Sequence, residues 1–283
     1  MKKTAKRLLM CMLLVVFACT CSGCGKMTAE KVMEKFTENQ VTMDNCEATM
    51  KMNMVMEASG ESFEMNVDAA MQVIAKPDMK AKVAMSMDMG ELGSYDMDTY
   101  IIKEGEQYYT YINASDMWMK QAIDSEEIDE QLSTYSNQMN YDVYTKNMQN
   151  FVLEGEELVG EKETYKITGV VSGESLKEVM EQSGVSEYSA TELEGIDFSQ
   201  MGDLPVTLWV EKKTFHPAKI SIDMAGMMAN ILAAAEETEG EVSGVTIPAC
   251  SIELEYVSFD VQDIVLPEEA KDAVEMDADS TEE

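Results

Sequence analysis

The stretch MKMNMVMEASGESFEMNVDAAMQV, residues 50–73, alternates apolar and polar side chains twice in succession. Its first half places methionines at every second position from Met50 to Met56. Its second half repeats the alternation from Phe63 to Val73. A period of two is typical of a β-strand that is apolar on one face only. Because Gly60 lies between the halves, the stretch predicts two antiparallel strands joined by a turn.

The same alternation recurs along the chain and predicts a sheet of about ten antiparallel strands. After the first two, the predicted strands cover residues 79–89, 97–103, 107–112, 117–120, 151–159, 164–171, 204–210, 218–224 and 249–261. Helical patterns cover residues 28–39, 125–150, 175–182 and 225–237. A large sheet that is apolar on one side must be covered by other elements. The sequence therefore predicts an α+β fold in which a curved antiparallel sheet wraps around a few helices.

Composition and charge exclude several classes of function. The 283 residues carry 54 acidic and 21 basic side chains, a formal net charge of −33 at pH 7. Such a chain lacks the basic surface that nucleic-acid binding requires. A single histidine, His216, gives little scope for acid–base catalysis or for a histidine-based metal site. With no recognisable nucleophile motif or phosphate-binding loop, we expect a protein that is not an enzyme and needs no cofactor or metal.

The N-terminus has the features of a bacterial export signal. Four basic side chains within residues 2–7 are followed by an apolar run over residues 8–18. This run is too short to span a membrane and fits a signal peptide over residues 1–23. Small residues then precede Cys24, which resembles the lipidated cysteine of a bacterial lipoprotein. Cys19 is a second match to the same pattern, and cleavage without lipidation is a further alternative.

The remaining chain divides into three parts by pattern. We expect a lipid tether and an amphipathic helix over residues 24–43, a sheet domain over residues 44–266, and an acidic, disordered tail over residues 267–283. A lipidated Cys24 would carry two acyl chains, which suffice for stable anchoring. The sequence thus predicts a protein held on the extracytoplasmic face of the cell membrane by an N-terminal lipid.

Cys46 and Cys250 are the cysteines that follow the signal segment. Each shares the parity of apolar neighbours in its strand, so each is expected on the apolar face. Outside the cytoplasm such a pair can form a disulfide. Two buried free thiols, acting as small apolar side chains, fit the sequence equally well.

Three segments resemble the LolA-like and LppX-like superfamily of lipoprotein carriers, and within it Gram-positive surface lipoproteins of unknown function. They are QYYTYI (107–112) leading to MWMK (117–120), LWVEKKTFHPAKI (208–220) and DIVLPEEA (263–270). The resemblance covers most of residues 28–270. It implies a half-open antiparallel barrel around helices, with an apolar cavity for a lipid or another hydrophobic molecule. It implies no catalytic residues.

Methionine is unusually frequent, and thirteen of the 27 methionines lie between Met50 and Met119. A flexible, polarizable thioether suits a surface that binds apolar molecules of variable shape. Strand parity predicts a ligand cavity lined by Met50, Met52, Met54, Phe63, Met65, Met71, Met85 and Met87. One alternative is that the methionines fill a core in place of leucine and valine. Another is that their thioethers bind a soft metal such as copper(I).

These observations together predict a non-enzymatic, membrane-anchored lipoprotein that binds a hydrophobic, lipid-like ligand in a methionine-lined cavity. The alternative is a ligand-free interaction or sensor module at the cell envelope. The sequence names no protein partner.

The anchor is tested by the substitution Cys24→Ser. Without the thiol that receives the lipid, the protein should be released into the medium or remain unprocessed. Cell fractionation and the mass of the N-terminal peptide report both outcomes. A Cys24→Ser protein that stays processed and membrane-bound would refute lipidation at Cys24 and point to Cys19.

Overall fold

The computed structural model describes residues 27–39, 45–115, 117–124, 128, 141–182, 201–239 and 244–276. Twelve strands lie in this part of the chain: β1 (Asn45–Ala58), β2 (Glu61–Ile74), β3 (Lys80–Asp88), β4 (Ser94–Glu104), β5 (Gln107–Ala114), β6 (Met117–Ile123), β7 (Met148–Val159), β8 (Lys162–Val171), β9 (Leu204–Glu211), β10 (Pro217–Asp223), β11 (Val245–Ser258) and β12 (Val274–Glu275). The helices are α2 (Ala29–Glu38), α4 (Asp142–Thr145), α5 (Gly173–Gln182), α7 (Ala225–Glu239) and the 3₁₀ turns η1 (Gly90–Leu92) and η3 (Glu268–Asp272).

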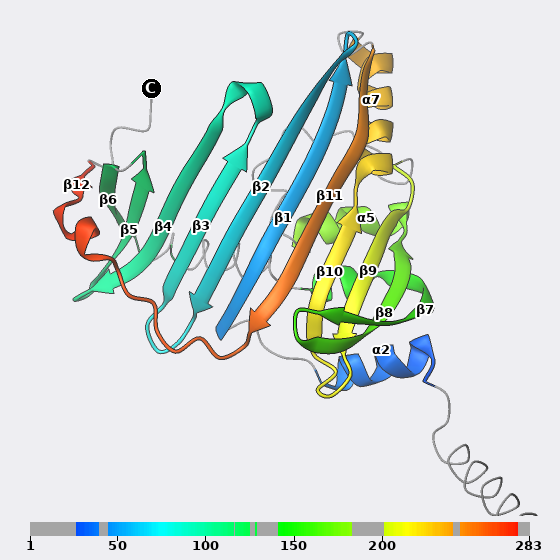
Figure 1. The fold of residues 1–283 in the computed structure, drawn as a ribbon, viewed down its shortest axis with the longest axis horizontal. Coiled ribbons are helices and arrows are strands. Elements are labelled where there is room, and N and C mark those ends of the chain that lie inside the picture. Colours follow the sequence, from blue (N-terminus) through cyan, green and yellow to red (C-terminus); the bar gives the residue numbers. More distant parts are fainter. Residues whose placement is uncertain are drawn as a thin grey trace, which may run out of the picture.

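All these strands form one sheet, in the order β12-β6-β5-β4-β3-β2-β1-β11-β10-β9-β8-β7 (Figure 1). Neighbouring strands are antiparallel, except that β12 pairs with β6 in parallel. The sheet is curved and does not close. The predicted α+β fold, a half-open antiparallel barrel with a few helices, is confirmed.

The quoted stretch folds as the β1–β2 hairpin. The two strands pair without a register shift from Asn45 and Ile74 to Ala58 and Glu61. Ser59 and Gly60 form the turn, and both have positive φ angles, of 56° and 84°. Two successive residues with positive φ define the turn type whose twist suits a hairpin. On its other side β1 pairs with β11, so β1 joins the N-terminal hairpins to the C-terminal half of the sheet.

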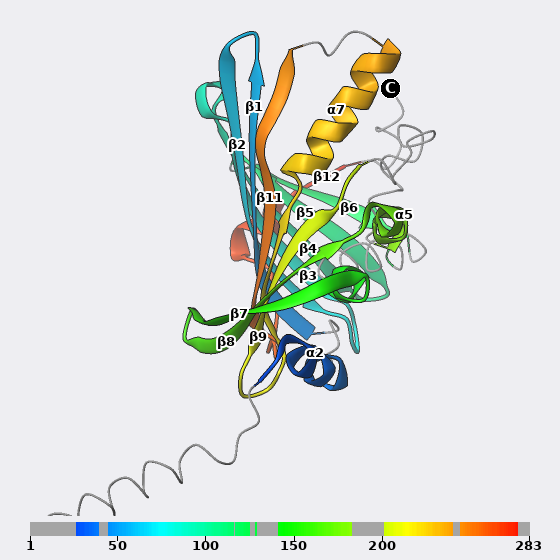
Figure 2. The same cartoon turned by 90° about the vertical axis from the view of Figure 1, so that its right-hand side faces the viewer.

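The helices cover one side of the sheet (Figure 2). Helix α2 buries Val32, Met33 and Phe36, as its amphipathic pattern predicts, and begins after Thr28, whose hydroxyl accepts a hydrogen bond from the Lys31 amide. These side chains share one core with Leu176 of α5 and with residues of the sheet. The core therefore lies between the sheet and the helices on that side.

The C-terminal segment differs from the prediction of a disordered tail beginning at residue 267. Residues 267–276 include η3 and β12, and the Met276 amide donates a 2.8 Å hydrogen bond to the Lys120 carbonyl. Ala270 is fully buried in an apolar cluster with Tyr100 and Tyr111. A few apolar side chains thus fix an otherwise acidic segment to the sheet, which composition alone did not reveal. Residues 277–283 lie outside the described residues.

In two further places the observed elements begin or end at other residues than predicted. Within the predicted helix over residues 125–150, the described residues form the short α4, and β7 already begins at Met148. Helix α5 begins at Gly173, two positions before the predicted N-cap Ser175. In both places the observed boundary differs from the predicted one by two or three residues, close to the usual scatter of element ends.

Gly169 in β8 offers a test of the packing between β7 and β8. A Cβ atom at this position would lie 2.5 Å from Met148 Cε and 2.7 Å from the Gln149 carbonyl oxygen. Gly169→Ala should therefore lower the free energy of unfolding by about 1–3 kcal/mol, because backbone and side chain must shift. Urea denaturation measures the change.

The matched control is Gly226→Ala in α7, where no heavy atom lies within 4 Å of the added Cβ. Alanine favours a helix over glycine by up to about 1 kcal/mol, so this variant should be unchanged or slightly more stable. Equal losses of stability in the two variants would contradict the close packing of β7 on β8.

Candidate functional site: the methionine face

Cross-strand pairing places the predicted ligand residues on one face of the sheet. Met54 pairs with Met65 across β1 and β2, and Ala69 pairs with Met85 across β2 and β3. Directly opposed residues of antiparallel strands project from the same face. This face, called the methionine face below, carries Met50, Met52, Met54, Met56, Phe63, Met65, Met71, Met85, Met87 and Met97. Met56 and Met97 were not among the predicted site residues, although they share the parity of their neighbours.

Burial divides the methionine face into a packed part and an open part. Met71 is only 6% exposed and belongs to the main core, and Met50 packs against that core. At the opposite end Phe63 is 43% exposed. Between these limits lie the half-buried Met52, Met54, Met56, Met65, Met85, Met87 and Met97. The alternative that methionine fills a core therefore holds for Met71, while the other side chains keep accessible surface.

The reverse face of the same strands is polar. The Asn53 amide donates a 2.9 Å hydrogen bond to the Asn66 side-chain oxygen on the neighbouring strand. Lys51 lies 3.6 Å from Asp68, and both side chains are mostly exposed. Such an exposed pair contributes at most about 1 kcal/mol. The two faces thus differ sharply, as period-two alternation requires.

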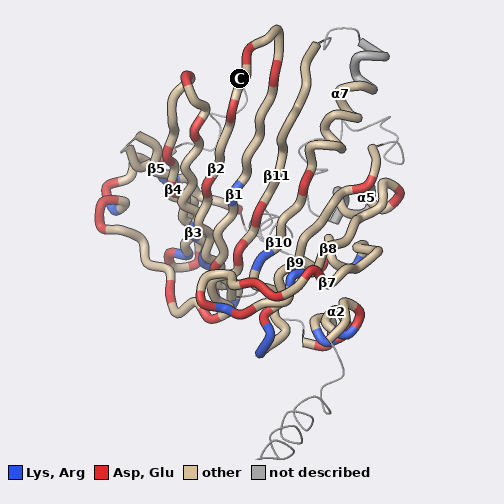
Figure 3. The backbone as a smooth tube through the Cα atoms, turned by 45° about the vertical axis from the view of Figure 1, so that its right-hand side comes forward, with Lys and Arg blue, Asp and Glu red and all other residues tan. Residues whose placement is uncertain are grey.

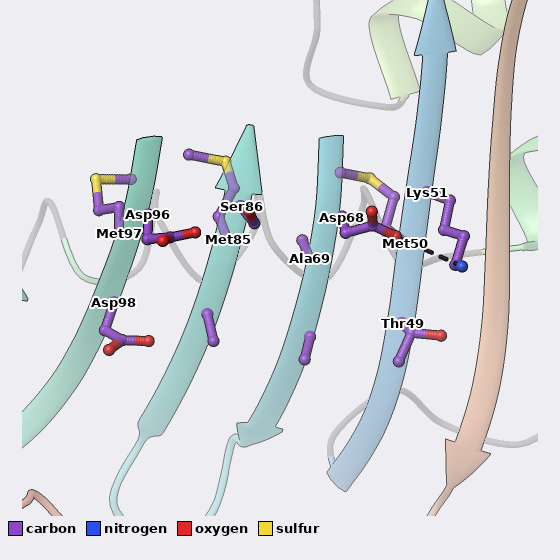
Figure 4. A pocket seen from close by; sticks show the side chains of 12 residues that line it. Thr49, Met50, Lys51, Asp68, Ala69, Met85, Ser86, Asp96, Met97 and Asp98 are labelled. Atoms are coloured by element: carbon purple, nitrogen blue, oxygen red, sulfur yellow. Dashed lines mark ion pairs between the residues drawn. The ribbon is translucent and has the colours of Figure 1, made fainter. Parts of the chain in front are cut away.

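A groove of about 490 Å³ crosses β1 to β4 at the row formed by Met50, Ala69, Met85 and Met97 (Figure 4). The other eight lining residues project from the reverse face, so the groove opens on that face and not on the methionine face: Thr49, Lys51, Asp68, Ala70, Ala84, Ser86, Asp96 and Asp98. The alanines keep the groove open because their side chains are small. Its polar lining contains three carboxylates and one lysine, and that lysine is paired with Asp68.

The structure decides between the two alternatives for the cysteines. Cys46 lies opposite Val73, and Cys250 lies opposite Met54, eight positions further along β1. At about 3.3 Å per residue this separates them by about 26 Å, far beyond disulfide reach. Both are free and buried, so a disulfide between them is excluded in this fold. Burial raises the pKa of the Cys46 thiol to about 12 and also raises the pKa of Cys250.

The described residues bear on metal binding and on membrane-spanning helices, whereas the cysteines of the predicted anchor lie outside them. Within the described ranges, no group of three or more His, Cys, Asp or Glu side chains is placed to hold a metal ion. That finding does not concern thioethers, so copper(I) binding by methionine stays a prediction. None of the described helices is both long and apolar enough to cross a membrane. Cys24 and Cys19 lie outside the described residues.

Comparison with known proteins identifies the family. Residues 28–275 match the family described as "Family of unknown function (DUF6612)". The chain belongs to this family. No curated protein matches it.

Several solved structures are similar in fold. The lipoprotein LppX of Mycobacterium tuberculosis has 15% identity, and the match covers 80% of this chain and 91% of LppX with a TM-score of 0.35. LprF from Mycobacterium bovis has 11% identity, coverage of 87% and 100%, and a TM-score of 0.46. A LolA superfamily protein from Nitrosomonas europaea has 11% identity, coverage of 85% and 96%, and a TM-score of 0.22. Because the identities are at most 15% and the TM-scores are below 0.5, function is inferred below from the residues of this chain alone.

The reactivity of the Cys46 and Cys250 thiols tests the strand pairing that holds these two residues apart. In a chain that begins at residue 27, both cysteines should resist alkylation at pH 8, because they are buried and protonated. Denaturation without reductant should then make both reactive, which mass spectrometry detects as two added groups. A chain in which neither cysteine reacts even after denaturation would contain the disulfide that the structure excludes.

Proposed function

We propose that this protein is a non-enzymatic lipoprotein of the cell envelope that holds a hydrophobic, lipid-like ligand on the methionine face. The observation that carries the proposal is the half-buried state of contiguous apolar side chains across β1 to β4. Folding normally buries the apolar face of a sheet. A contiguous accessible apolar surface is a common mark of a ligand or interaction site.

The chemistry of the methionine face fits an apolar ligand. From Met50 to Met56 and from Phe63 to Val73, every second residue on this face is Met, Phe, Val or Ala. A ligand lying there would contact carbon and sulfur atoms of the strands and meet no nucleophile, acid or base from them. Flexible thioethers adapt to different apolar shapes, which favours a ligand class over a single compound.

The chain direction supports a position close to the membrane. Four residues lie between Cys24 and Ala29, the start of α2, so the five steps from one to the other span at most about 18 Å. Helix α2 lies at the end of the sheet opposite the β1–β2 turn (Figure 1). A lipid on Cys24 would therefore hold the α2 end near the membrane and direct the open part of the methionine face away from it.

Ligand binding is tested with the substitution Met85→Asp. An unpaired carboxylate among thioethers has a desolvation cost well above 1.4 kcal/mol, so affinity for a lipophilic dye such as N-phenyl-1-naphthylamine should fall at least about tenfold. Fluorescence titration measures the affinity. The control is Ser86→Asp, which adds the same charge to the adjacent, exposed position on the reverse face and should leave dye binding unchanged.

Native ligand is sought by extracting protein purified from membranes and analysing the extract by mass spectrometry. A lipid present in stoichiometric amount supports the proposal. Equal dye binding by both variants, together with an extract free of lipid, would contradict it and favour the ligand-free interaction module.

A further inference from the structure

Seven methionines of the methionine face remain accessible to small molecules from the solvent. Each is half-buried, whereas Met71 at the packed part of the face is 6% exposed. Met54 lies directly opposite Met65 across β1 and β2. Met85 likewise lies opposite Met97 across β3 and β4, so the side chains of each pair are close neighbours. The seven, called the open methionines below, are Met52, Met54, Met56, Met65, Met85, Met87 and Met97.

The methionines of the main core are shielded from the solvent. Six of them are at most 9% exposed: Met33, Met71, Met79, Met148, Met201 and Met227. A reagent that acts from the solvent therefore reaches the open methionines before it reaches these six. Chemical change of the open methionines should thus alter the methionine face and leave the core packing, and with it the fold, intact.

The two described thiols do not compete for an oxidant. Cys46 and Cys250 are both buried and free. Burial raises the pKa of the Cys46 thiol to about 12 and also raises the pKa of Cys250. Because the thiolate is the reactive form, both are protected in the folded protein at neutral pH. Among the described residues, the sulfur atoms open to an oxidant are therefore those of methionine.

Oxidation of a thioether reverses the polarity of the surface that carries it. The sulfur donates an electron pair to one oxygen of hydrogen peroxide, so a sulfur–oxygen bond forms while the oxygen–oxygen bond breaks. The displaced hydroxide takes the proton from the transferred oxygen and leaves as water. Sulfur is oxidised by two electrons and the peroxide is reduced. The product, methionine sulfoxide, is polar and disrupts methionine-rich apolar surfaces.

The charge on these strands favours an uncharged oxidant. Residues 51–68 and 84–98 contain eight acidic side chains and one basic side chain, Lys51, which pairs with Asp68. Figure 3 shows the acidic positions along these hairpins. A surface of one sign disfavours the approach of reagents of its own sign. Hydrogen peroxide carries no charge at neutral pH, so it reaches the open methionines without the penalty that an anionic oxidant would meet.

We propose that the open methionines are a reversible oxidation site, at which hydrogen peroxide turns the ligand-binding surface from apolar to polar and so releases the ligand. The inference rests on the proposed function, because it concerns the same surface, and it adds a condition under which that surface stops binding. Leucine or valine would supply apolar surface without this chemistry. Methionine sulfoxide reductases, one for each epimer, reverse the change: a dithiol is oxidised to a disulfide and the sulfoxide oxygen leaves as water.

The site is tested by treating the purified protein with hydrogen peroxide and removing the excess with catalase. Peptide mass spectrometry should find an added oxygen on the open methionines well before the six core methionines. The affinity for N-phenyl-1-naphthylamine should then fall at least about tenfold, because an apolar ligand must remove water from each sulfoxide that it covers. Both reductases with dithiothreitol should restore the affinity.

Three results of this experiment would overturn the proposal. The first is equal affinity before and after oxidation of the open methionines. The second is oxidation of the core methionines at the same rate as the open ones. The third is loss of the folded state on oxidation, which thermal unfolding of the oxidised protein detects.

Two variants, each with four leucines, locate the effect. The first removes the thioethers of the two opposed pairs and keeps their apolar volume: Met54, Met65, Met85 and Met97. It should bind the dye and lose much less affinity after peroxide than the native protein. The second replaces four accessible methionines outside the methionine face and should lose as much affinity as the native protein: Met89, Met117, Met119 and Met276. Equal losses in the two variants would refute the assignment to the methionine face.

Dye binding before oxidation separates the two proposals. A protein that binds N-phenyl-1-naphthylamine and keeps its affinity once the open methionines are oxidised refutes the oxidation site alone. A protein that binds no dye before oxidation, and yields no lipid on extraction, refutes the proposed function as well.

Discussion

The register of β1 is the constraint on which the rest of the structure depends. This strand pairs along its length with β2 and with β11, so it fixes the position of both halves of the sheet. Because side chains alternate with a period of two, a slip of one residue would move every methionine of β1 to the reverse face. The tight turn at Ser59 and Gly60 prevents such a slip in the hairpin. The methionine face therefore exists because one turn and one long strand hold a single register.

The two faces of the sheet are covered in different ways. Helices pack on the methionine side and bury it around Met71, leaving the ends of β1 to β4 accessible. On the reverse side the segment after β11 packs Val261, Ile264 and Ala270 onto Tyr100 and Tyr111. That segment ends in β12, which pairs with β6 and covers one edge of the sheet. Among the described residues, coverage of β4 to β6 on the reverse side and of β7 to β11 on the helix side leaves the half-buried part of the methionine face as an apolar surface accessible to a ligand.

The local alternation of side chains predicted the strands and α2, but it could not predict which distant strands pair. Period-two alternation located the strands, and Thr28 with an amphipathic pattern located α2, because both signals lie within a few residues. The neighbour of β1 could not be read in this way, since β11 lies about two hundred residues away in sequence. For the same reason the shared parity of Cys46 and Cys250 left a disulfide open, although their positions along β1 rule it out.

An accessible apolar face is also a liability, because two such faces can associate. The acidic side chains offset that tendency. Residues 51–68 and 84–98, which carry the open methionines, hold nearly all of their charge in one sign, so two copies bring like charges together on these hairpins and repel each other. Acidic residues that alternate with methionines on the same strands thus give these hairpins one apolar face and one charged face, and the charge opposes association of the apolar faces.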